Sequence, residues 1–218
     1  AGSYFFTSKY ELQKLKDRNL SKNFKNFLLS NGFGYEKEND FYYNSFLFKK
    51  EKRRFISEKI SYLIIVPTLR CNLSCSYCQV SRANINAKGF DWNKADVNKL
   101  IIFIQNNCSE NIKLEFQGGE PTLRMDLLKL IIKKVSLIKP KATFVICTNL
   151  QKLSHEMLEL LENPNIQIST SIDGPEYVHN KQRINNSELT KTFFKNLEIV
   201  ERKIGIGRLG ALPTITDF

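Results

Sequence analysis

The residues best suited to chemistry in this sequence are three closely spaced cysteines, Cys71, Cys75 and Cys78. Three residues separate the first pair and two separate the second, so a single loop can direct all three thiols towards one point. Cysteine thiolates bind transition metals and iron–sulfur clusters, and cysteine pairs carry out thiol–disulfide exchange. The chain has five cysteines in total, and an odd number argues against a framework of disulfides.

A structural zinc site is the first of three interpretations, and it requires a fourth protein ligand. No further cysteine or histidine lies close to the three in the sequence. The fold would have to bring one from a distance, and the available side chains are Cys108, Cys147, His155 and His179. On this interpretation the chain would be a zinc-binding nucleic-acid module.

Thiol redox chemistry and an iron–sulfur cluster are the other two interpretations. A redox motif needs two cysteines separated by two residues, which Cys75 and Cys78 provide, but it leaves Cys71 without a role. A four-iron cluster held by three thiolates leaves one iron open to another ligand, whereas electron-transfer clusters normally have four cysteine ligands. Of these two, only the open cluster uses every thiol of the loop.

Strands and helices alternate around the cysteines. Residues 62–66 form a short apolar run with β-branched side chains that ends at Pro67, which is typical of a buried strand. The cysteines thus follow the first strand, at the end where α/β folds place their chemistry. Further strands are expected at 112–116, 143–147, 166–172 and 207–213, and helices at 93–106, 123–138, 154–161 and 188–204. This alternation predicts an α/β fold with a parallel sheet.

A glycine-rich turn follows the second expected strand. Gly118 and Gly119 allow the backbone to approach a ligand closely, and Pro121 favours the start of a helix. The carboxylate of Glu120 can face the ammonium group of a ligand. Taken alone, the same pattern describes an ordinary strand-to-helix turn, so its interpretation depends on the cysteines one unit earlier.

Together these motifs resemble the radical S-adenosylmethionine superfamily. The matching features are Cys-x3-Cys-x2-Cys after a strand, an aromatic Tyr77 just before Cys78, and Gly-Gly-Glu-Pro one unit later. The resemblance implies a partial (β/α)6 barrel in which Cys71, Cys75 and Cys78 hold a 4Fe-4S cluster. The open iron would bind the amino and carboxylate groups of S-adenosylmethionine. Reductive cleavage would yield a 5′-deoxyadenosyl radical that removes a hydrogen atom from the substrate.

The resemblance also implies which residues contact the two ends of S-adenosylmethionine. The Gly-Gly-Glu-Pro turn matches the motif that holds the methionine amino group. Arg183 lies where an arginine pairs with the methionine carboxylate, a task that suits a planar guanidinium. Tyr77 occupies the position whose ring or backbone lies against adenine, and Leu212 is expected to line the adenine pocket.

Two later turns carry further expected site residues. Asn149 follows the third strand, where related enzymes have Thr-Asn-Gly, and it is expected to hydrogen-bond near the cosubstrate. This chain has Leu150 in place of the glycine, so the backbone freedom of glycine is lost. After the fourth strand, Ser171 is expected to contact the ribose or carboxylate, and Asp173 to organise the turn.

Finer details resemble the peptide-modifying branch of the superfamily. Ser-x-Asp-Gly after the fourth strand, Cys-Gln-x-Ser-Arg at 78–82 and Gln117 before the glycines are similar to the radical maturases of the His-Xaa-Ser system, relatives of the anaerobic sulfatase maturases. This resemblance implies a peptide or protein substrate and a low-potential electron donor of the flavodoxin or ferredoxin type. A non-catalytic peptide-binding module of the same fold is the alternative.

The remaining sequence predicts two domains and a cytoplasmic protein. Residues 1–57 combine helical patterns with an aromatic, strand-like stretch at 41–48, which predicts a small α+β module that serves either peptide recognition or as a structural cap. Residues 58–218 would be the core, ending after about five of six βα units. No secretory leader or membrane span is recognised. The net charge of +11 fits a lysine-rich surface, so nucleic acid is not an expected partner.

Overall fold

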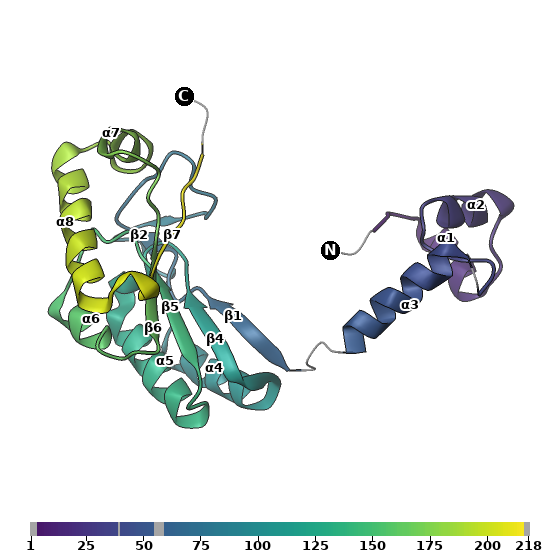
Figure 1. Cartoon of the computed structure of the whole chain (residues 1–218), viewed down its shortest axis with the longest axis horizontal. Helices are drawn as coiled ribbons and strands as arrows, with labels where there is room; N and C mark the ends of the chain where they lie inside the picture. The colour runs from purple at the N-terminus through teal and green to yellow at the C-terminus, as the bar shows by residue number, and fades with distance from the viewer. Residues whose placement is uncertain (1–3, 39, 55–58, 216–218) are drawn as a thin grey trace. The chain divides into compact units, whose positions relative to one another are not determined.

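A computed structural model describes residues 4–38, 40–54 and 59–215 of this chain. The chain divides into two compact units, one within residues 1–58 and one within residues 59–218 (Figure 1). Helices occur in both units, whereas every strand of the described residues belongs to the second.

The described part of the N-terminal unit is helical, so the expected strand at 41–48, and with it the α+β module, is wrong. Aromatic residues favour strands only in a suitable context. Here the Asp40 carboxylate accepts a hydrogen bond from the Tyr43 backbone N–H at 2.7 Å, which favours a helix start, and residues 49–52 are good helix formers. The helices are α1 (Lys9–Lys16), α2 (Lys22–Ser30) and α3 (Phe41–Arg54).

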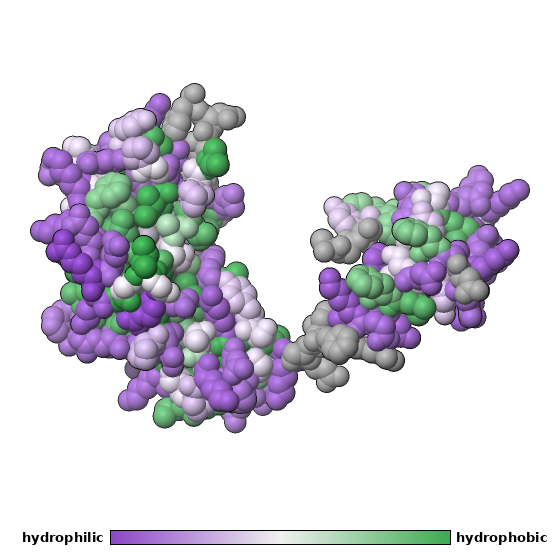
Figure 2. Space-filling view, in the orientation of Figure 1, coloured by the Kyte–Doolittle hydropathy of each residue, from purple (hydrophilic) through white to green (hydrophobic). Residues whose placement is uncertain are grey.

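Burial in the N-terminal unit is slight. Among its described residues, Leu28 is the one side chain classed as buried, with 7% exposed. The ring of Phe5 packs on those of Phe27 and Phe33, but Phe41 and Phe48 remain 79% and 68% exposed. Green apolar residues accordingly reach the surface of this unit among the hydrophilic ones (Figure 2).

The second unit is built on the expected parallel sheet, and its α/β class is confirmed. All four strand pairings are parallel, in the order β1-β4-β5-β6-β7. The strands are β1 (Ile60–Ile65), β4 (Cys108–Phe116), β5 (Thr143–Cys147), β6 (Ile166–Thr170) and β7 (Leu209–Ala211). Because the strands run in one direction, the loops that carry the cysteines and the glycine-rich turn meet at one edge of the sheet.

Helices cover one face of this sheet (Figure 1). They are α4 (Lys94–Asn107), α5 (Met125–Ile138), α6 (His155–Leu160) and α8 (Ser187–Ile204). Alternate strand residues such as Leu114 and Phe116 are fully buried in the core that these helices cover. Glu115 between them projects to the opposite face. None of the described helices combines the length and the apolar character that crossing a membrane requires.

Short elements that the sequence patterns do not reveal surround the strand ends. Two short strands and one single turn of helix flank the cysteine loop and the glycine-rich turn, a second single turn and a π-helix follow β6, and a third single turn precedes β7. They are β2 (Arg70–Cys71), β3 (Ala83–Asn84), η1 (Pro121–Arg124), α7 (Glu176–His179), the π-helix η2 (Asn180–Ile184) and η3 (Ile206–Arg208). β2 and β3 pair in parallel. The segment of residues 71–82, which we call the cysteine loop, connects them, so its two ends lie side by side.

Candidate functional site

A cavity of about 320 Å³ opens at the carboxyl ends of the strands. The structure brings nearly all of the site residues expected from the sequence to its wall. Pro121 and Asp173 are the two that do not line it. The expected residues that do are Cys71, Cys75, Tyr77, Cys78, Gly118, Gly119, Glu120, Asn149, Ser171, Arg183 and Leu212.

The three thiols are free and have few partners in the protein. Cys71 and Cys75 are partly buried and Cys78 is exposed. The Cys71 sulfur accepts a hydrogen bond from the Leu73 N–H at 3.4 Å, and the Cys78 thiol donates to the Val80 carbonyl at 3.3 Å. Burial raises the pKa of both Cys71 and Cys75, so binding of a metal centre would release their protons.

The two glycines of the turn bring it against the cysteine loop. The Gly119 N–H donates to the Thr68 carbonyl at 3.1 Å, and the Glu120 N–H donates to the Arg70 carbonyl at 2.8 Å. A Cβ at Gly118 would stand 2.3 Å from the Thr68 oxygen, and one at Gly119 would stand 2.2 Å from the Arg70 oxygen. The close approach that these glycines permit is therefore to the chain itself, whereas the sequence suggested a ligand.

Glu120 is buried beneath this turn, with 2% of its surface exposed. One carboxylate oxygen accepts hydrogen bonds from the Thr122 N–H at 3.1 Å and hydroxyl at 2.6 Å, and the other accepts from the Asn149 N–H at 2.7 Å. Burial raises the pKa of Glu120 although these donors oppose the shift. Pro121 is the first residue of η1, as its fixed φ favours.

Asn149 links the third strand to the cysteine loop. Its side-chain amide donates to the Asn72 side-chain oxygen at 2.8 Å and approaches the Cys71 sulfur at 3.9 Å. Leu150 adopts a left-handed φ of 53°, a conformation that glycine enters more easily than any other residue. This conformation costs a non-glycine residue about 1–2 kcal/mol, and burial of the Leu150 side chain in the core offsets the cost.

Tyr77 joins Asp173 to Arg183 through two hydrogen bonds, and Tyr77 and Arg183 both line the cavity. The Tyr77 hydroxyl donates to the Asp173 carboxylate at 2.6 Å and accepts from Arg183 at 2.5 Å. Burial, followed by the hydrogen bond to Asp173, raises the pKa of Tyr77 to about 12. Asp173 also accepts from the Thr214 backbone N–H at 3.1 Å. Asp173 thus organises its surroundings without lining the cavity.

The π-helix brings Arg183 to the cavity and also binds the cysteine loop. The carbonyl of Gln182 accepts hydrogen bonds from both the backbone N–H and the hydroxyl of Ser76, each at 3.0 Å. His179, one turn earlier, is fully buried and stacks on Phe193 with ring centroids 4.2 Å apart. Burial lowers the pKa of His179 to about 4, which suits a neutral packing residue.

The family model of the Radical SAM superfamily matches residues 65–217. This chain belongs to the radical SAM superfamily. The match extends from the end of β1 beyond β7 and includes every expected site residue. It therefore covers the core unit and leaves the three N-terminal helices outside.

Relatives and solved structures extend this assignment. An uncharacterised protein of Methanothermobacter thermautotrophicus is 32% identical over 162 residues, which cover 72% of this chain and 58% of that protein. A cysteine-type anaerobic sulfatase-maturating enzyme of Clostridium novyi is 27% identical over 154 residues, covering 66% and 41%. The structure of native anSMEcpe with bound AdoMet shares the fold, with a TM-score of 0.60, 19% identity, and coverage of 71% and 43%. The chain thus spans about half the length of the proteins it matches.

The cysteine loop of this radical SAM core fits the ligand set of a 4Fe-4S cluster. Its three thiols are free, lie on one loop and line one cavity. In the described ranges, no three His, Cys, Asp or Glu side chains gather as they would around a single metal ion. A four-iron cluster is wider than one ion, so its cysteine ligands stand further apart than those of zinc.

The sequence motifs do not reveal a polar cluster around Glu115, on the face of the radical SAM sheet opposite the helices. The Glu115 carboxylate accepts hydrogen bonds from the side chains of Tyr62, Gln117 and Cys147, the last at 3.3 Å. Burial and the Glu115 charge raise the pKa of Cys147 to about 12, so this thiol stays protonated. The one sequence signal is a carboxylate between Leu114 and Phe116, two core residues of the same strand.

Proposed function

We propose that this chain holds a 4Fe-4S cluster on Cys71, Cys75 and Cys78 and uses S-adenosylmethionine to remove a hydrogen atom from a peptide or protein. The observation that carries the proposal is the shared cavity, because the free thiols line it together with the Gly-Gly-Glu-Pro turn. When bound, such a cluster supplies the electron that splits S-adenosylmethionine into methionine and a 5′-deoxyadenosyl radical.

The protein's own residues would bind and orient the cosubstrate. The Gly-Gly-Glu-Pro turn would hold the methionine amino group, and Arg183 would pair with the carboxylate. Arg183 now donates to the neutral Tyr77 hydroxyl, and a carboxylate is the stronger acceptor for a guanidinium. Ser171 and Asn149 would contact polar groups of the ligand from the strand ends, since both line the cavity.

The adenine end would lie towards Tyr77 and Leu212. Both side chains line the cavity, and Leu212 is 59% exposed, so it offers an apolar surface that a bound base would cover. Covering this surface also excludes water from the reacting atoms, which is the protein's main contribution to radical chemistry.

We further propose that the substrate is a peptide or protein. This is supported by the similarity to a sulfatase-maturating enzyme. A low-potential donor of the flavodoxin or ferredoxin type would supply the electron, and the cytoplasm is the proposed location. We assign residues 58–218 to the catalytic core and residues 1–57 to a peptide-recognition module, since exposed aromatic side chains such as Phe41 and Phe48 suit peptide binding.

Anaerobic reconstitution of the full chain with iron and sulfide tests the proposal. The expected product is a brown protein with broad visible absorption, and the Cys75→Ala variant should stay nearly colourless. Binding of S-adenosylmethionine should then perturb the electron paramagnetic resonance spectrum of the reduced cluster. A colourless protein that holds stoichiometric zinc would contradict the proposal, and a cluster that never responds to S-adenosylmethionine would favour a non-catalytic module.

A further inference from the structure

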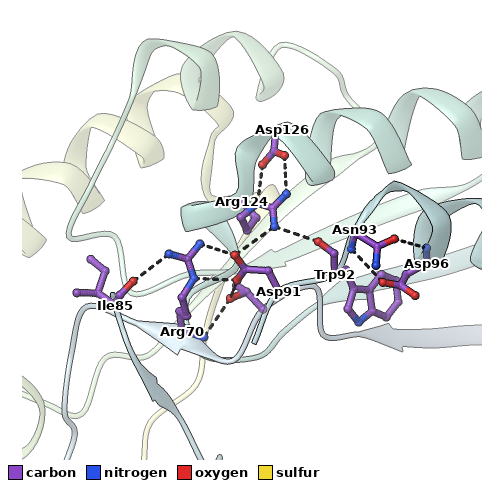
Figure 3. A network of polar contacts seen from close by, with 9 residues as sticks. Arg70, Ile85, Asp91, Trp92, Asn93, Asp96, Arg124 and Asp126 are labelled. Carbon is purple, nitrogen blue, oxygen red and sulfur yellow. Dashed lines mark hydrogen bonds and ion pairs between the residues drawn. The ribbon is translucent and has the colours of Figure 1, made fainter. Parts of the chain in front are cut away.

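We propose that Asp91 is a positioning residue that binds both Arg70 and Arg124 and so fixes the cysteine loop against the Gly-Gly-Glu-Pro turn. We refer to these three residues as the clamp and to the two arginines as its arms. The inference deepens the proposed function and rests on it for the identity of the ligand. The fixed geometry itself depends only on this chain's residues. Figure 3 shows the two guanidinium groups converging on the Asp91 carboxylate.

The first arm holds the residue that precedes Cys71. Arg70 donates through Nε to one Asp91 oxygen at 2.8 Å and through a terminal nitrogen to the other at 2.7 Å. This bidentate geometry fixes the plane of the guanidinium as well as its position. The Thr68 hydroxyl donates to the same carboxylate at 2.6 Å, and the other terminal nitrogen of Arg70 donates to the Ile85 carbonyl at 2.9 Å.

The second arm comes from the end of η1, which the Gly-Gly-Glu-Pro turn begins. A terminal guanidinium nitrogen of Arg124 lies 3.2 Å from a carboxylate oxygen of Asp91, and the same nitrogen donates to the Trp92 carbonyl at 3.0 Å. It also makes a bidentate pair with Asp126, at 2.9 and 2.7 Å. Asp91 therefore joins two segments that both line the cavity, and it lies outside the cavity itself.

Arg70 is held at every polar group that the structure describes for it. Its backbone N–H donates to the Thr68 hydroxyl at 3.0 Å, its carbonyl accepts a hydrogen bond from the backbone N–H of Glu120 at 2.8 Å, and its side chain binds Asp91. Cys71 is the next residue, and a single rigid peptide unit joins it to Arg70, so fixing Arg70 also fixes the backbone position of Cys71. The side chains of the three charged residues are only 19–28% exposed, so solvent screens their attraction less than at a surface pair.

Asp91→Asn tests the clamp, with Asp126→Asn as the matched control. Both substitutions remove one carboxylate from Arg124, but only the first frees the cysteine loop. We expect hydrogen–deuterium exchange of the apo chain across residues 70–78 to rise roughly tenfold in Asp91→Asn, as expected for losing charged hydrogen bonds. Exchange in the control should stay close to that of the unaltered chain. After reconstitution, Asp91→Asn should also lose iron to a chelator faster than the control.

The outcomes separate the clamp from the proposed function. Equal exchange across residues 70–78 in Asp91→Asn and Asp126→Asn would overturn the clamp, whatever cluster the chain binds. An unaltered chain that binds no cluster would refute the proposed function, and the exchange comparison would still decide the clamp. Should Asp91→Asn fail to fold, Arg70→Lys keeps the charge and removes the bidentate geometry, and the same exchange measurement applies.

Discussion

Two sides of the cavity differ in what their polar groups bind. One, the strand-end side, is formed by the turns after β4 and β5, with Glu120 and Cys147, and the other, the cysteine side, is formed by the cysteine loop. On the strand-end side, the Glu120 carboxylate accepts three hydrogen bonds from within the protein. On the cysteine side, the backbone and Arg70 are held firmly, whereas the sulfurs of Cys75 and Cys78 have at most a weak contact within the loop. On the strand-end side, the protein therefore satisfies the polar group with its own hydrogen bonds. On the cysteine side, it fixes the backbone, and the thiols line the cavity.

The difference separates residues that position a site from residues that bind its ligand. Positioning residues are already satisfied within the protein, so their loss should appear in the apo chain. Ligating residues contribute little to the apo chain, so their loss should appear only when the ligand binds.

Removing a thiol should give the largest effect, and only in the loaded protein. Cys75→Ala should lower the iron bound after reconstitution at least tenfold, because a three-ligand site cannot lose one thiolate, while apo stability changes by less than about 0.5 kcal/mol. Iron analysis and chemical denaturation measure the two quantities. Cys147→Ala, which removes a cavity thiol outside the expected ligand set, should keep its iron. Equal iron in both variants would contradict the ligand assignment.

Gly119→Ala should damage the apo chain itself. The added Cβ would meet the Arg70 carbonyl at 2.2 Å, and backbone cannot move aside as a flexible side chain does. We expect a loss of about 3 kcal/mol in the free energy of unfolding, measured by urea denaturation. Gly207→Ala is the control, because a Cβ there meets nothing within 4 Å. Similar stability in the two variants would show that the turn does not rest on the loop.

Arg183→Lys should weaken S-adenosylmethionine binding roughly tenfold, because a lysine cannot make the bidentate contact with a carboxylate. Titration of the reconstituted protein gives the dissociation constant. The control is Arg202→Lys, at an exposed pair with Glu198 on α8. An unchanged affinity in Arg183→Lys would remove Arg183 from the proposed binding set.

The buried Glu120 predicts a particular pH dependence of apo stability. Its pKa is raised in the folded chain, so its stabilising contribution is complete below its unfolded pKa of about 4.3 and is lost as the pH rises through the folded value. Glu120→Gln should therefore flatten the fall in unfolding free energy above pH 4.3, by on the order of 1 kcal/mol per pKa unit. His179 has a lowered pKa and acts in the opposite direction in both proteins, so the difference between them isolates Glu120.

The thiols themselves offer the mildest test. Cys147 has a pKa of about 12 and lies on the strand-end side, so little thiolate forms at pH 8 and alkylation should be slow. Cys78 is exposed and should react first. Mass spectrometry of the apo chain during iodoacetamide treatment gives the order. Labelling of Cys147 before Cys78 would contradict this difference between the two sides.

The sequence predicts the sheet well because its signals are local. Short apolar runs define the strands, and the run at 143–147 coincides with β5. The strand predicted at 41–48 is a helix because its capping contact, from Asp40, outweighs aromatic propensity. Propensity is a weak guide wherever an element packs against little else, as in α3, where most of the described side chains are exposed.

The site is predictable in its members and not in its contacts. Spacing and motifs identify the cysteines and the Gly-Gly-Glu-Pro turn, but not that the glycines pack against the cysteine loop. Asp91 joins Arg70 and Arg124 across 21 and 33 residues of sequence, a pairing that only the folded chain creates. The π-helix that presents Arg183 is likewise set by tertiary contacts, since Gln182 binds Ser76 from the cysteine loop.

Formation of 5′-deoxyadenosine would show directly whether this chain cleaves S-adenosylmethionine at a cluster held by its three cysteines. The anaerobically reconstituted full chain would be incubated with S-adenosylmethionine and dithionite, with Cys75→Ala treated in parallel, and the products separated by chromatography. The unaltered chain should yield 5′-deoxyadenosine and methionine in equal amounts, and the variant should yield only background. A chain that holds its cluster and binds S-adenosylmethionine, yet forms no more 5′-deoxyadenosine than Cys75→Ala, would contradict the proposed function.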